Sequence, residues 1–510
     1  MKEDSLKKRY FYKLSANLFG MVMGLITNAI TPRALGPQTY GNFNFLTNFF
    51  HQIVAFLDMG TSIGFYAKLS QRQKDYALIT FYFYFMAIVS SLVILFTIIA
   101  FKTSLFKFIW PDQRAYFVFL AALFGILTWL IQILTRITDA YGLTAPAEIV
   151  KALQRGFLTL ILGLLYIFGM LNLESLFYSQ IFLSVILGFV FWWIIKPKCK
   201  EIGWKINTTK IKNYLKEFYT YSHPLFVYAL VGLLVGLLDR WLLQIFAGSR
   251  EQGFYGLSYT IGAFCSLFTG AMQPLLMREF SISYGDKNIE QMKILFRKYI
   301  PLLYSIAAYF ACFVAIQSAK VVYIFGGSKY HAAILPVAIM AFYPIHQTYG
   351  QLSGSVFYAT DQTALYRNIG ITMMLIGLPI TYILLAPTNM FGLDAGALGL
   401  AIKMVTLQFI TVNIQLYFNA KYLRFSYFRY LGHQILVLLC LTGLAGVSYL
   451  VIDYSINNLN VVMRFLLSGM VYTGLVVLLT YYVPIVFGLN KPLLNSIIKM
   501  VFREIKGEYS

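Results

Sequence analysis

The sequence predicts an all-α integral membrane protein with about 14 transmembrane helices, and three observations carry this prediction. Of its 510 residues 59% are hydrophobic and only 12% are charged, whereas soluble domains carry about 25% charged residues. Apolar stretches that reach the roughly 20 residues needed to cross a bilayer recur along the whole chain. The positive residues are concentrated in alternate connections between these stretches, as expected of a multi-pass membrane protein.

Taken in order, the apolar stretches form two sets of six and a final pair. The first set predicts spans at 14–34, 42–66, 78–100, 116–140, 148–169 and 176–195. The second set predicts spans at 218–246, 253–277, 299–318, 332–358, 367–386 and 395–418, and the final pair lies at 430–451 and 463–486. We therefore expect an N-terminal lobe (1–195), a basic cytoplasmic linker (196–217), a C-terminal lobe (218–418), and two further spans with a cytoplasmic tail (419–510).

The distribution of charge predicts the orientation. The chain has a net charge of +21, which in a soluble protein would suggest a nucleic-acid partner. Counted at alternate ends of the predicted spans, 31 Lys and Arg fall on the side of the N-terminus and 8 on the other side. By the positive-inside rule both termini are cytoplasmic. The charge is thus explained as an orientation signal and a contact for anionic membrane lipids, without nucleic acid.

A glycine pattern predicts that the two sets of six spans are repeats. Four glycines in the first span and its turn recur at one constant interval in the seventh: Gly20, Gly24, Gly36 and Gly41 match Gly232, Gly236, Gly248 and Gly253. The G-x-x-x-G steps allow helices to approach closely. A weaker similarity pairs Thr138-Asp139 with Thr360-Asp361. The alternative is a chance recurrence among the 37 glycines. Repeats of this kind place a substrate between two halves that rock to give alternating access.

Charged residues within predicted spans are candidates for substrate contact, because a charge at the bilayer centre costs roughly 2.5–3.5 kcal/mol on insertion scales. Asp239 and Arg240 lie in the seventh span and point about 100° apart on a helix, so they do not neutralise one another on one face. Alternatively, Arg240 extends to the outer interface beside Trp241. Lys403 in the twelfth span is a third candidate.

The fifth span begins with two cations on one face. Lys151 and Arg155 are four residues apart, so they form a doubly positive strip that suits a pyrophosphate. Alternatively both extend to the cytoplasmic interface, an explanation that fits Lys151 better than the deeper Arg155. Arg33 and Asp58, near the ends of the first two spans, are interpreted as helix-terminus or interhelical contacts.

The tenth span is unusually polar. It contains Pro344, His346, Gln347 and Gln351. A proline frees a backbone carbonyl that can line a cavity, the amides could bind sugar hydroxyls, and His346 could take up a proton near neutral pH. The alternative for His346 is a structural, hydrogen-bonded residue of the bundle.

The sequence lacks the motifs that are typical of disulfide-bonded, metal-binding, nucleotide-binding and catalytic proteins. The four cysteines (Cys199, Cys265, Cys312 and Cys440) are scattered, with neither disulfide nor metal-ligand spacing. There is no phosphate-binding G-x-x-x-x-G-K-[ST] loop, and no catalytic grouping of carboxylates or of Ser, His and Asp in one loop. We therefore expect neither an enzyme nor a bound cofactor or metal.

Three segments resemble the polysaccharide transporter family. They are Pro32-Arg33-Ala34-Leu35-Gly36-Pro37-Gln38-Thr39-Tyr40-Gly41, then Leu57-Asp58-Met59-Gly60, and Leu238-Asp239-Arg240 followed by Gly253-Phe254-Tyr255. The chain resembles the Wzx-type flippase branch of the multidrug/oligosaccharidyl-lipid/polysaccharide exporter superfamily. The resemblance implies a flippase of the bacterial inner membrane that carries an undecaprenyl-pyrophosphate-linked oligosaccharide outward for O-antigen, capsule or exopolysaccharide synthesis.

The same resemblance implies a cationic central cavity, coupling to a proton or sodium gradient, and partners among the glycan polymerase machinery. The cationic candidates Arg155, Arg240 and Lys403 are chosen by depth and charge, not by a match to family motifs. Three alternatives stay open. A drug or cation antiporter of the superfamily would need deep acidic residues, a membrane glycan polymerase would need a large outer loop, and a structural assembly subunit would transport nothing alone.

Overall fold

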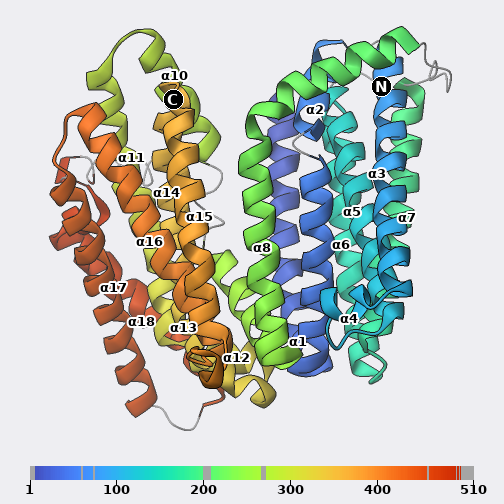
Figure 1. The fold of residues 1–510 in the computed structure, drawn as a ribbon. Helices are drawn as coiled ribbons and strands as arrows, with labels where there is room; N and C mark the ends of the chain where they lie inside the picture. The colour runs from blue at the N-terminus through green and yellow to red at the C-terminus, as the bar shows by residue number, and fades with distance from the viewer. Residues whose placement is uncertain are drawn as a thin grey trace. The chain divides into compact units, whose positions relative to one another are not determined.

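The computed structural model describes residues 6–58, 61–72, 75–198, 208–265, 272–455, 459–489, 491–492 and 494. These residues form α-helices joined by turns and short 3₁₀ segments, with no β-strand among them, so the protein is all-α. Ten of the described helices are long and apolar enough to cross a membrane. The contacts divide the chain into two compact units, Met1–Gly253 and Phe254–Ser510, which are described in turn (Figure 1).

The first unit is a bundle built from long helices. They are α1 (Leu6–Asp58), α2 (Thr61–Gln71), α3 (Tyr76–Lys102), α4 (Leu105–Ile109), α5 (Ala115–Ala140), α6 (Thr144–Ile167), α7 (Leu173–Ile195), the 3₁₀ turn η1 (Lys196–Lys198) and α8 (Thr208–Phe264) as far as Gly253. Helix α1 packs on α5 and α6, and α5 packs on α3 and α7. One part of the core is aromatic, with Trp110 enclosed by Phe49, Phe50 and Phe106.

Two of the helices turn a corner at a glycine. Helix α1 contains the predicted span 14–34 and most of the predicted span 42–66, joined at Gly36 with φ 73° and ψ 170°. The span 42–66 is not one helix, because α1 ends at Asp58 and residues 61–66 belong to α2. Helix α8 joins the seventh and eighth predicted spans in the same way, at Gly248 with φ 77° and ψ −177°. Glycine adopts positive φ without steric cost because it has no Cβ. The two corners occupy equivalent positions of the predicted repeat and share one backbone conformation.

The start of α8 lies across one end of this unit. The side chains of Tyr214 and Phe218 are buried in its core, while Glu217 forms a salt bridge of 3.1 Å with Arg72. The Tyr214 hydroxyl donates a hydrogen bond of 2.7 Å to Asp75 Oδ1. This helical start is the described end of the predicted basic linker 196–217, of which 199–207 lie outside the described residues.

The second unit begins with the last part of α8 and contains the remaining helices. They are α10 (Gln273–Gly285), α11 (Ile289–Ile316), α12 (Ser318–Gly326), η2 (Ser328–Ala333), α13 (Ile334–Met340), α14 (Tyr343–Ala359), α15 (Thr363–Leu385), η3 (Thr388–Met390), α16 (Gly396–Leu423), α17 (Tyr427–Ser455), α18 (Val461–Tyr482) and η4 (Pro484–Phe487). Its core runs through α11, α14, α16 and α17. The lobes predicted at 1–195 and 218–418 differ from these contact units and stay a prediction about the repeat.

The structure corrects one detail of the predicted tenth span. The stretch 332–358 is not one helix but two, α13 and α14, which are separated at Ala341 and Phe342. Pro344 lies in the first turn of α14, where a proline costs no helical hydrogen bond. The proline therefore starts a helix here and does not interrupt one.

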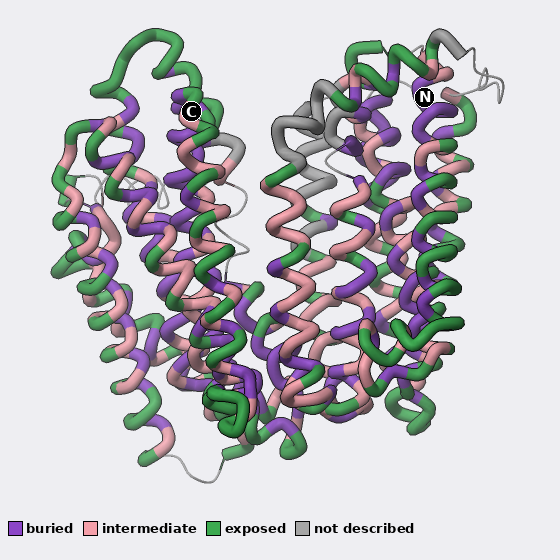
Figure 2. The backbone as a smooth tube through the Cα atoms, in the orientation of Figure 1, coloured by how far each residue is buried: buried purple, intermediate pink, exposed green. Residues whose placement is uncertain are grey.

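The outer surface of the bundle is apolar where lipid is expected. On α3, Ile88, Leu92, Leu95 and Ile99 are 61%, 51%, 52% and 52% exposed, and their spacing places them on one face. Figure 2 shows exposed and buried residues alternating along such helices. Exposed apolar stripes of this length are costly in water but not in a bilayer, so the protein is a multi-pass membrane protein.

Candidate functional site

Asp58 joins four helices of the first unit. It ends α1, and its side chain is 8% exposed. Its Oδ2 accepts a hydrogen bond of 2.8 Å from the Ser62 hydroxyl in α2, and its Oδ1 accepts bonds of 2.9 Å from Tyr82 in α3 and 3.0 Å from Trp129 in α5. With its oxygens occupied by these donors, the carboxylate holds the helices together and offers little to a ligand. The following Met59 and Gly60 lie outside the described residues.

Arg155 on α6 lies directly over a glycine of α1. A Cβ added to Gly20 would be 1.8 Å from Arg155 Nη1 and 2.9 Å from Cζ, so the guanidinium occupies the space that a side chain at Gly20 would need. One turn further on, Thr159 Oγ1 and Thr27 Oγ1 are 3.0 Å apart. By contrast, a Cβ on Gly24 would meet nothing within 4 Å. The first glycine step thus accommodates an exposed cation, which belongs to no salt bridge among the described residues.

Lys151 does not share the setting of Arg155. Its Nζ forms a 2.6 Å salt bridge with Glu148 Oε1, and the Glu148 side chain is only 4% exposed. The predicted doubly positive strip therefore contains one neutralised cation and one available cation. Glu148 is not among the site residues predicted from the sequence, although its spacing of three residues from Lys151 is a known signal for a helical ion pair.

The two glycine turns of the repeat pack against each other within the first unit. A Cβ on Gly41 would lie 1.7 Å from the carbonyl oxygen of Ser249, and a Cβ on Gly253 would lie 2.0 Å from that of Pro37. Ser249 is the repeat equivalent of Pro37, just as Gly253 is the equivalent of Gly41. The contact is therefore reciprocal, as in an interface with two-fold symmetry.

Arg240 and Asp239 lie on α8 just before this turn. Arg240 Nη1 donates a hydrogen bond of 3.2 Å to Gln252 Oε1, and the Gln252 amide donates to the Arg240 carbonyl. Asp239 is 8% exposed and Gln252 fully buried. Arg240 is thus turned toward the glycine turn of its own repeat, and Asp239 is buried beside it.

A network of amides surrounds the same turn. Gln244 donates a hydrogen bond of 2.9 Å to the Ser249 hydroxyl, and Gln113 donates one of 3.0 Å to Asn42. The Gln244 side-chain oxygen is buried without a hydrogen-bond partner among the described residues. These amides are not spaced periodically in the sequence, which explains why the sequence analysis missed them. Arg33 lies half-buried on α1 before the first corner.

Lys403 is a buried cation of the second unit. Its side chain is 4% exposed on α16. A Cβ on Gly377 of α15 would lie 3.0 Å from its Cε and 3.4 Å from its Nζ. The glycine therefore provides the space that the lysine occupies between α15 and α16.

The polar residues of helix α14 lie on two different faces, one buried and one partly exposed. His346 is 3% exposed, and its ring lies 5.0 Å from Phe409 between ring centroids. Its Nδ1 has no hydrogen-bond partner among the described residues. Gln347 and Gln351 are partly exposed on the face that also carries Tyr343 and Tyr358. The amides are therefore available to a ligand, whereas the histidine is enclosed by aromatic side chains.

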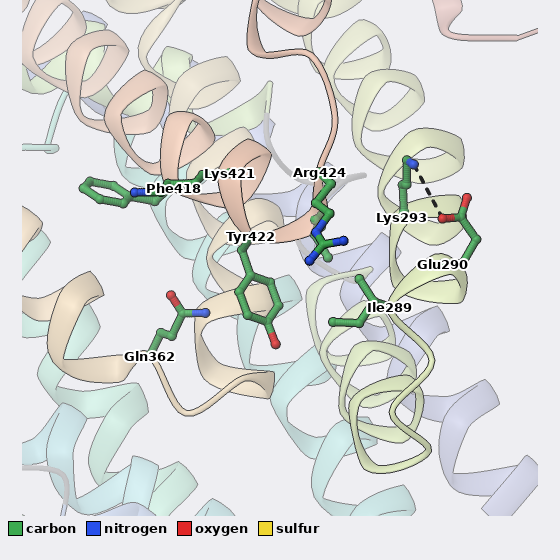
Figure 3. A pocket seen from close by; sticks show the side chains of 9 residues that line it. Ile289, Glu290, Lys293, Gln362, Phe418, Lys421, Tyr422 and Arg424 are labelled. Carbon is green, nitrogen blue, oxygen red and sulfur yellow. Dashed lines mark hydrogen bonds and ion pairs between the residues drawn. The ribbon is translucent and has the colours of Figure 1, made fainter.

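One polar pocket, of 710 Å³, opens at an end of the second unit. Figure 3 shows Arg424 and Tyr422 reaching from the end of α16 toward the space beside Gln362, while Lys293 pairs with Glu290 at 3.5 Å. Arg424 has φ 55°, the left-handed conformation that ends α16. Lys421 also lines the pocket, so this pocket could receive an anionic group.

A second network that the sequence analysis missed ties the last two helices to α12. Lys320 Nζ lies 2.5 Å from Asp453 Oδ2 on α17, and Arg464 Nη1 on α18 lies 3.2 Å from Asp453 Oδ1. Lys320 also donates a hydrogen bond of 2.9 Å to Gln317. Lys320 and Asp453 are 133 residues apart along the chain, so no local sequence pattern predicts their ion pair.

The described residues contain no group of three or more His, Cys, Asp or Glu that could hold a metal ion. Cys265, Cys312 and Cys440 are free thiols, and Cys199 lies outside the described residues.

Comparison with solved structures identifies the fold. The chain is similar to the lipid II flippase MurJ in an inward closed conformation, with a TM-score of 0.66, 13% identity, and coverage of 92% of this chain and 98% of that one. It is also similar to an inward-facing multidrug resistance MATE family transporter of the MOP superfamily, with a TM-score of 0.62, 14% identity, and coverage of 81% and 98%. A MOP superfamily transporter from Pyrococcus furiosus gives a TM-score of 0.53 at 13% identity, with coverage of 82% and 95%.

The long apolar helices and these similarities thus define a multi-pass helical membrane protein with the fold of the MOP superfamily transporters. The sequence also matches the family described as "Polysaccharide biosynthesis protein" over residues 6–273. Because this match covers more than half of the chain, the protein belongs to the polysaccharide biosynthesis protein family. The family predicted from the sequence motifs is confirmed. A search of curated proteins finds none that matches the sequence.

Proposed function

We propose that this protein is a flippase that moves an undecaprenyl-pyrophosphate-linked oligosaccharide across the bacterial inner membrane, with both termini in the cytoplasm. One observation carries the proposal: a chain with a transporter fold belongs to a polysaccharide biosynthesis family. The substrate of such a protein combines a polar glycan, an anionic diphosphate and a lipid tail. Its polar part must be shielded from hydrocarbon, where unsatisfied polar groups are costly.

The chain offers groups suited to each part of this substrate. Arg155 is an exposed guanidinium at the predicted membrane depth, and its planar fork suits phosphate oxygens. Arg240 and Lys403 are further cations, and Gln347 and Gln351 can bind sugar hydroxyls. In the proposed mechanism the diphosphate is attracted by the cations while the tail remains in lipid. Movement of the repeats, coupled to a proton or sodium gradient, then exposes the glycan on the other side.

The experiment replaces Arg155 or Arg240 by Ala and measures glycan export in cells that lack the wild-type chain. Export should fall below a tenth of the wild-type level while protein abundance stays unchanged, because each variant loses a cation that attracts the diphosphate. Lys107→Ala is the matched control, since Lys107 is an exposed cation outside the predicted spans. Normal export by both arginine variants would refute the cationic site.

The second candidate function is a drug or cation antiporter, because the same fold occurs in MATE transporters. Such a protein needs an accessible deep carboxylate, whereas Asp58 is occupied by Ser62, Tyr82 and Trp129. Purified protein in liposomes separates the two functions. We expect movement of a lipid-linked glycan and no uptake of a cationic dye, and the reverse result would favour the antiporter.

A further inference from the structure

Another pocket of the second unit lies between α11, the start of α17 and the segment that follows α18. It has a volume of 870 Å³. Arg297 and Lys298 of α11, Arg429 and His433 of α17, and Tyr482 and Ile485 near the end of α18 are among its lining residues. It shares no residue with the groups assigned to glycan transport above.

The Lys and Arg side chains that line this pocket are positive, and no acidic side chain lines it. Arg297, Lys298 and Arg429 are all exposed. None of the three cations belongs to a salt bridge within the described part of the chain. Three cations around one opening, without an acidic neighbour in the lining, favour an anion with several oxygens.

The same pocket also has an apolar lining. Tyr482, Ile485 and Ile294 are 71%, 56% and 49% exposed there. Large exposed apolar groups beside clustered cations match a ligand that is itself amphiphilic. A free phosphate ion would use the cations but would leave the apolar wall uncovered.

The wall of the pocket is fixed by packing. Ser305 donates a hydrogen bond of 2.8 Å to the Val486 carbonyl. Gly488, with φ 64°, packs against α11 so closely that an added Cβ would lie 2.6 Å from Pro301 Cβ. His433 lines the same space, and its buried Nε2 has no hydrogen-bond partner among the described residues. The pocket therefore has a preformed shape and an unused polar atom.

The position of the pocket indicates which leaflet it meets. Helices α11 and α17 both begin here, after connections on the side that the positive-inside rule assigns to the cytoplasm. Anionic lipids of that leaflet attract clustered Lys and Arg, and basic pockets between helices bind lipid headgroups. We propose that this pocket binds the phosphate headgroup of an anionic glycerophospholipid, with its acyl chains against the apolar wall.

The experiment measures lipid binding to the full-length protein after delipidation in detergent, by native mass spectrometry. Phosphatidylglycerol is the probe, and phosphatidylethanolamine tests the need for net negative charge. The double variant Arg297→Gln, Arg429→Gln should bind phosphatidylglycerol about 30-fold more weakly, from the typical contribution of two surface cations. Arg278→Gln, Lys287→Gln is the matched control, because it removes two exposed charges of the same unit outside the pocket, and it should bind as wild type.

Several outcomes decide the proposal. Full binding by the charge-conserving Arg297→Lys, Arg429→Lys pair, together with an unchanged melting temperature of the Gln pair, would support it. Equal affinity of wild type and the Gln pair would overturn it. Displacement of the lipid by millimolar inorganic phosphate would also overturn it, since the site would then belong to a free anion. Displacement by undecaprenyl phosphate at a lower concentration than phosphatidylglycerol requires would overturn it as well, since the site would then belong to a prenyl-linked substrate. Binding that appears only after residues 495–510 are deleted would assign the pocket to that tail.

Discussion

At the scale of single residues, the charged side chains of the helices fall into two groups. Asp58 and Asp453 are held by hydrogen bonds or ion pairs from neighbouring helices, and Glu148 is held by an ion pair within its own helix. Arg155 instead lies exposed above a glycine and has no ion-pair partner among the described residues. A buried charge is tolerated only with such partners, so the first group stabilises the bundle and the second is available to a ligand.

This distinction predicts the behaviour of Asp58 variants. Replacing Asp58 by Ala removes the acceptor of Ser62, Tyr82 and Trp129, and each buried donor left unpaired costs about 1–3 kcal/mol. We expect a clear fall in the melting temperature of the purified protein, and a smaller fall for Asp58→Asn, which keeps one oxygen acceptor. Thermal unfolding in detergent measures both.

The exposed Glu174 serves as the control for this series, and Glu174→Ala should melt within a degree or two of the wild type. If Asp58→Ala lost export while its melting temperature stayed unchanged, Asp58 would contact the substrate or a coupling ion and would not be a structural anchor.

At the scale of elements, the corners of α1 and α8 determine how these two helices pack against each other in the first unit. The corners at Gly36 and Gly248 bring Gly41 and Gly253 onto each other's turns, where the neighbouring atoms are backbone. Backbone cannot move aside as the end of a flexible side chain can. Any side chain at these two positions must therefore push the helices apart.

We accordingly predict that Gly41→Ala and Gly253→Ala each lower glycan export at least tenfold and reduce thermal stability. Gly24→Ala is the matched control, since a Cβ there meets nothing within 4 Å, and a helical Ala in place of Gly should be neutral or stabilising. Export assays and melting curves on all three variants test this. Wild-type behaviour of Gly41→Ala would show that the turns separate easily.

At the scale of the whole molecule, the bilayer explains the composition. The described helices expose apolar stripes such as that of α3, and the same helix buries Thr80 and Thr97. Such a molecule can present a polar path to a substrate while its outside remains soluble in lipid. This property does not select the cargo.

The cargo is tested by removing the chain from the cell. We predict that deletion causes a lipid-linked oligosaccharide to accumulate on the cytoplasmic face of the inner membrane, because synthesis continues while export stops. Extraction and mass spectrometry of prenyl-linked sugars identify it, with a strain carrying the wild-type chain as the control. An unchanged pool of lipid-linked sugar would contradict the proposed flippase.

The sequence by itself determined the all-α membrane fold, the family, and the glycine pattern that recurs at a constant interval. These depend on composition, on the length of apolar stretches and on backbone requirements of single glycines, which are all local. The corner at Gly36 is an example, because positive φ is a demand that one residue must meet alone.

Only the tertiary structure decided which charges are available. Arg155 of α6 lies over Gly20 of α1, and Lys320 pairs with Asp453 across 133 residues. The structure also placed His346 among aromatic rings. These outcomes depend on contacts between different helices, and a span's hydrophobicity does not encode which of its faces meets which neighbour. The Lys151–Glu148 pair and the helix start at Pro344 are local by contrast.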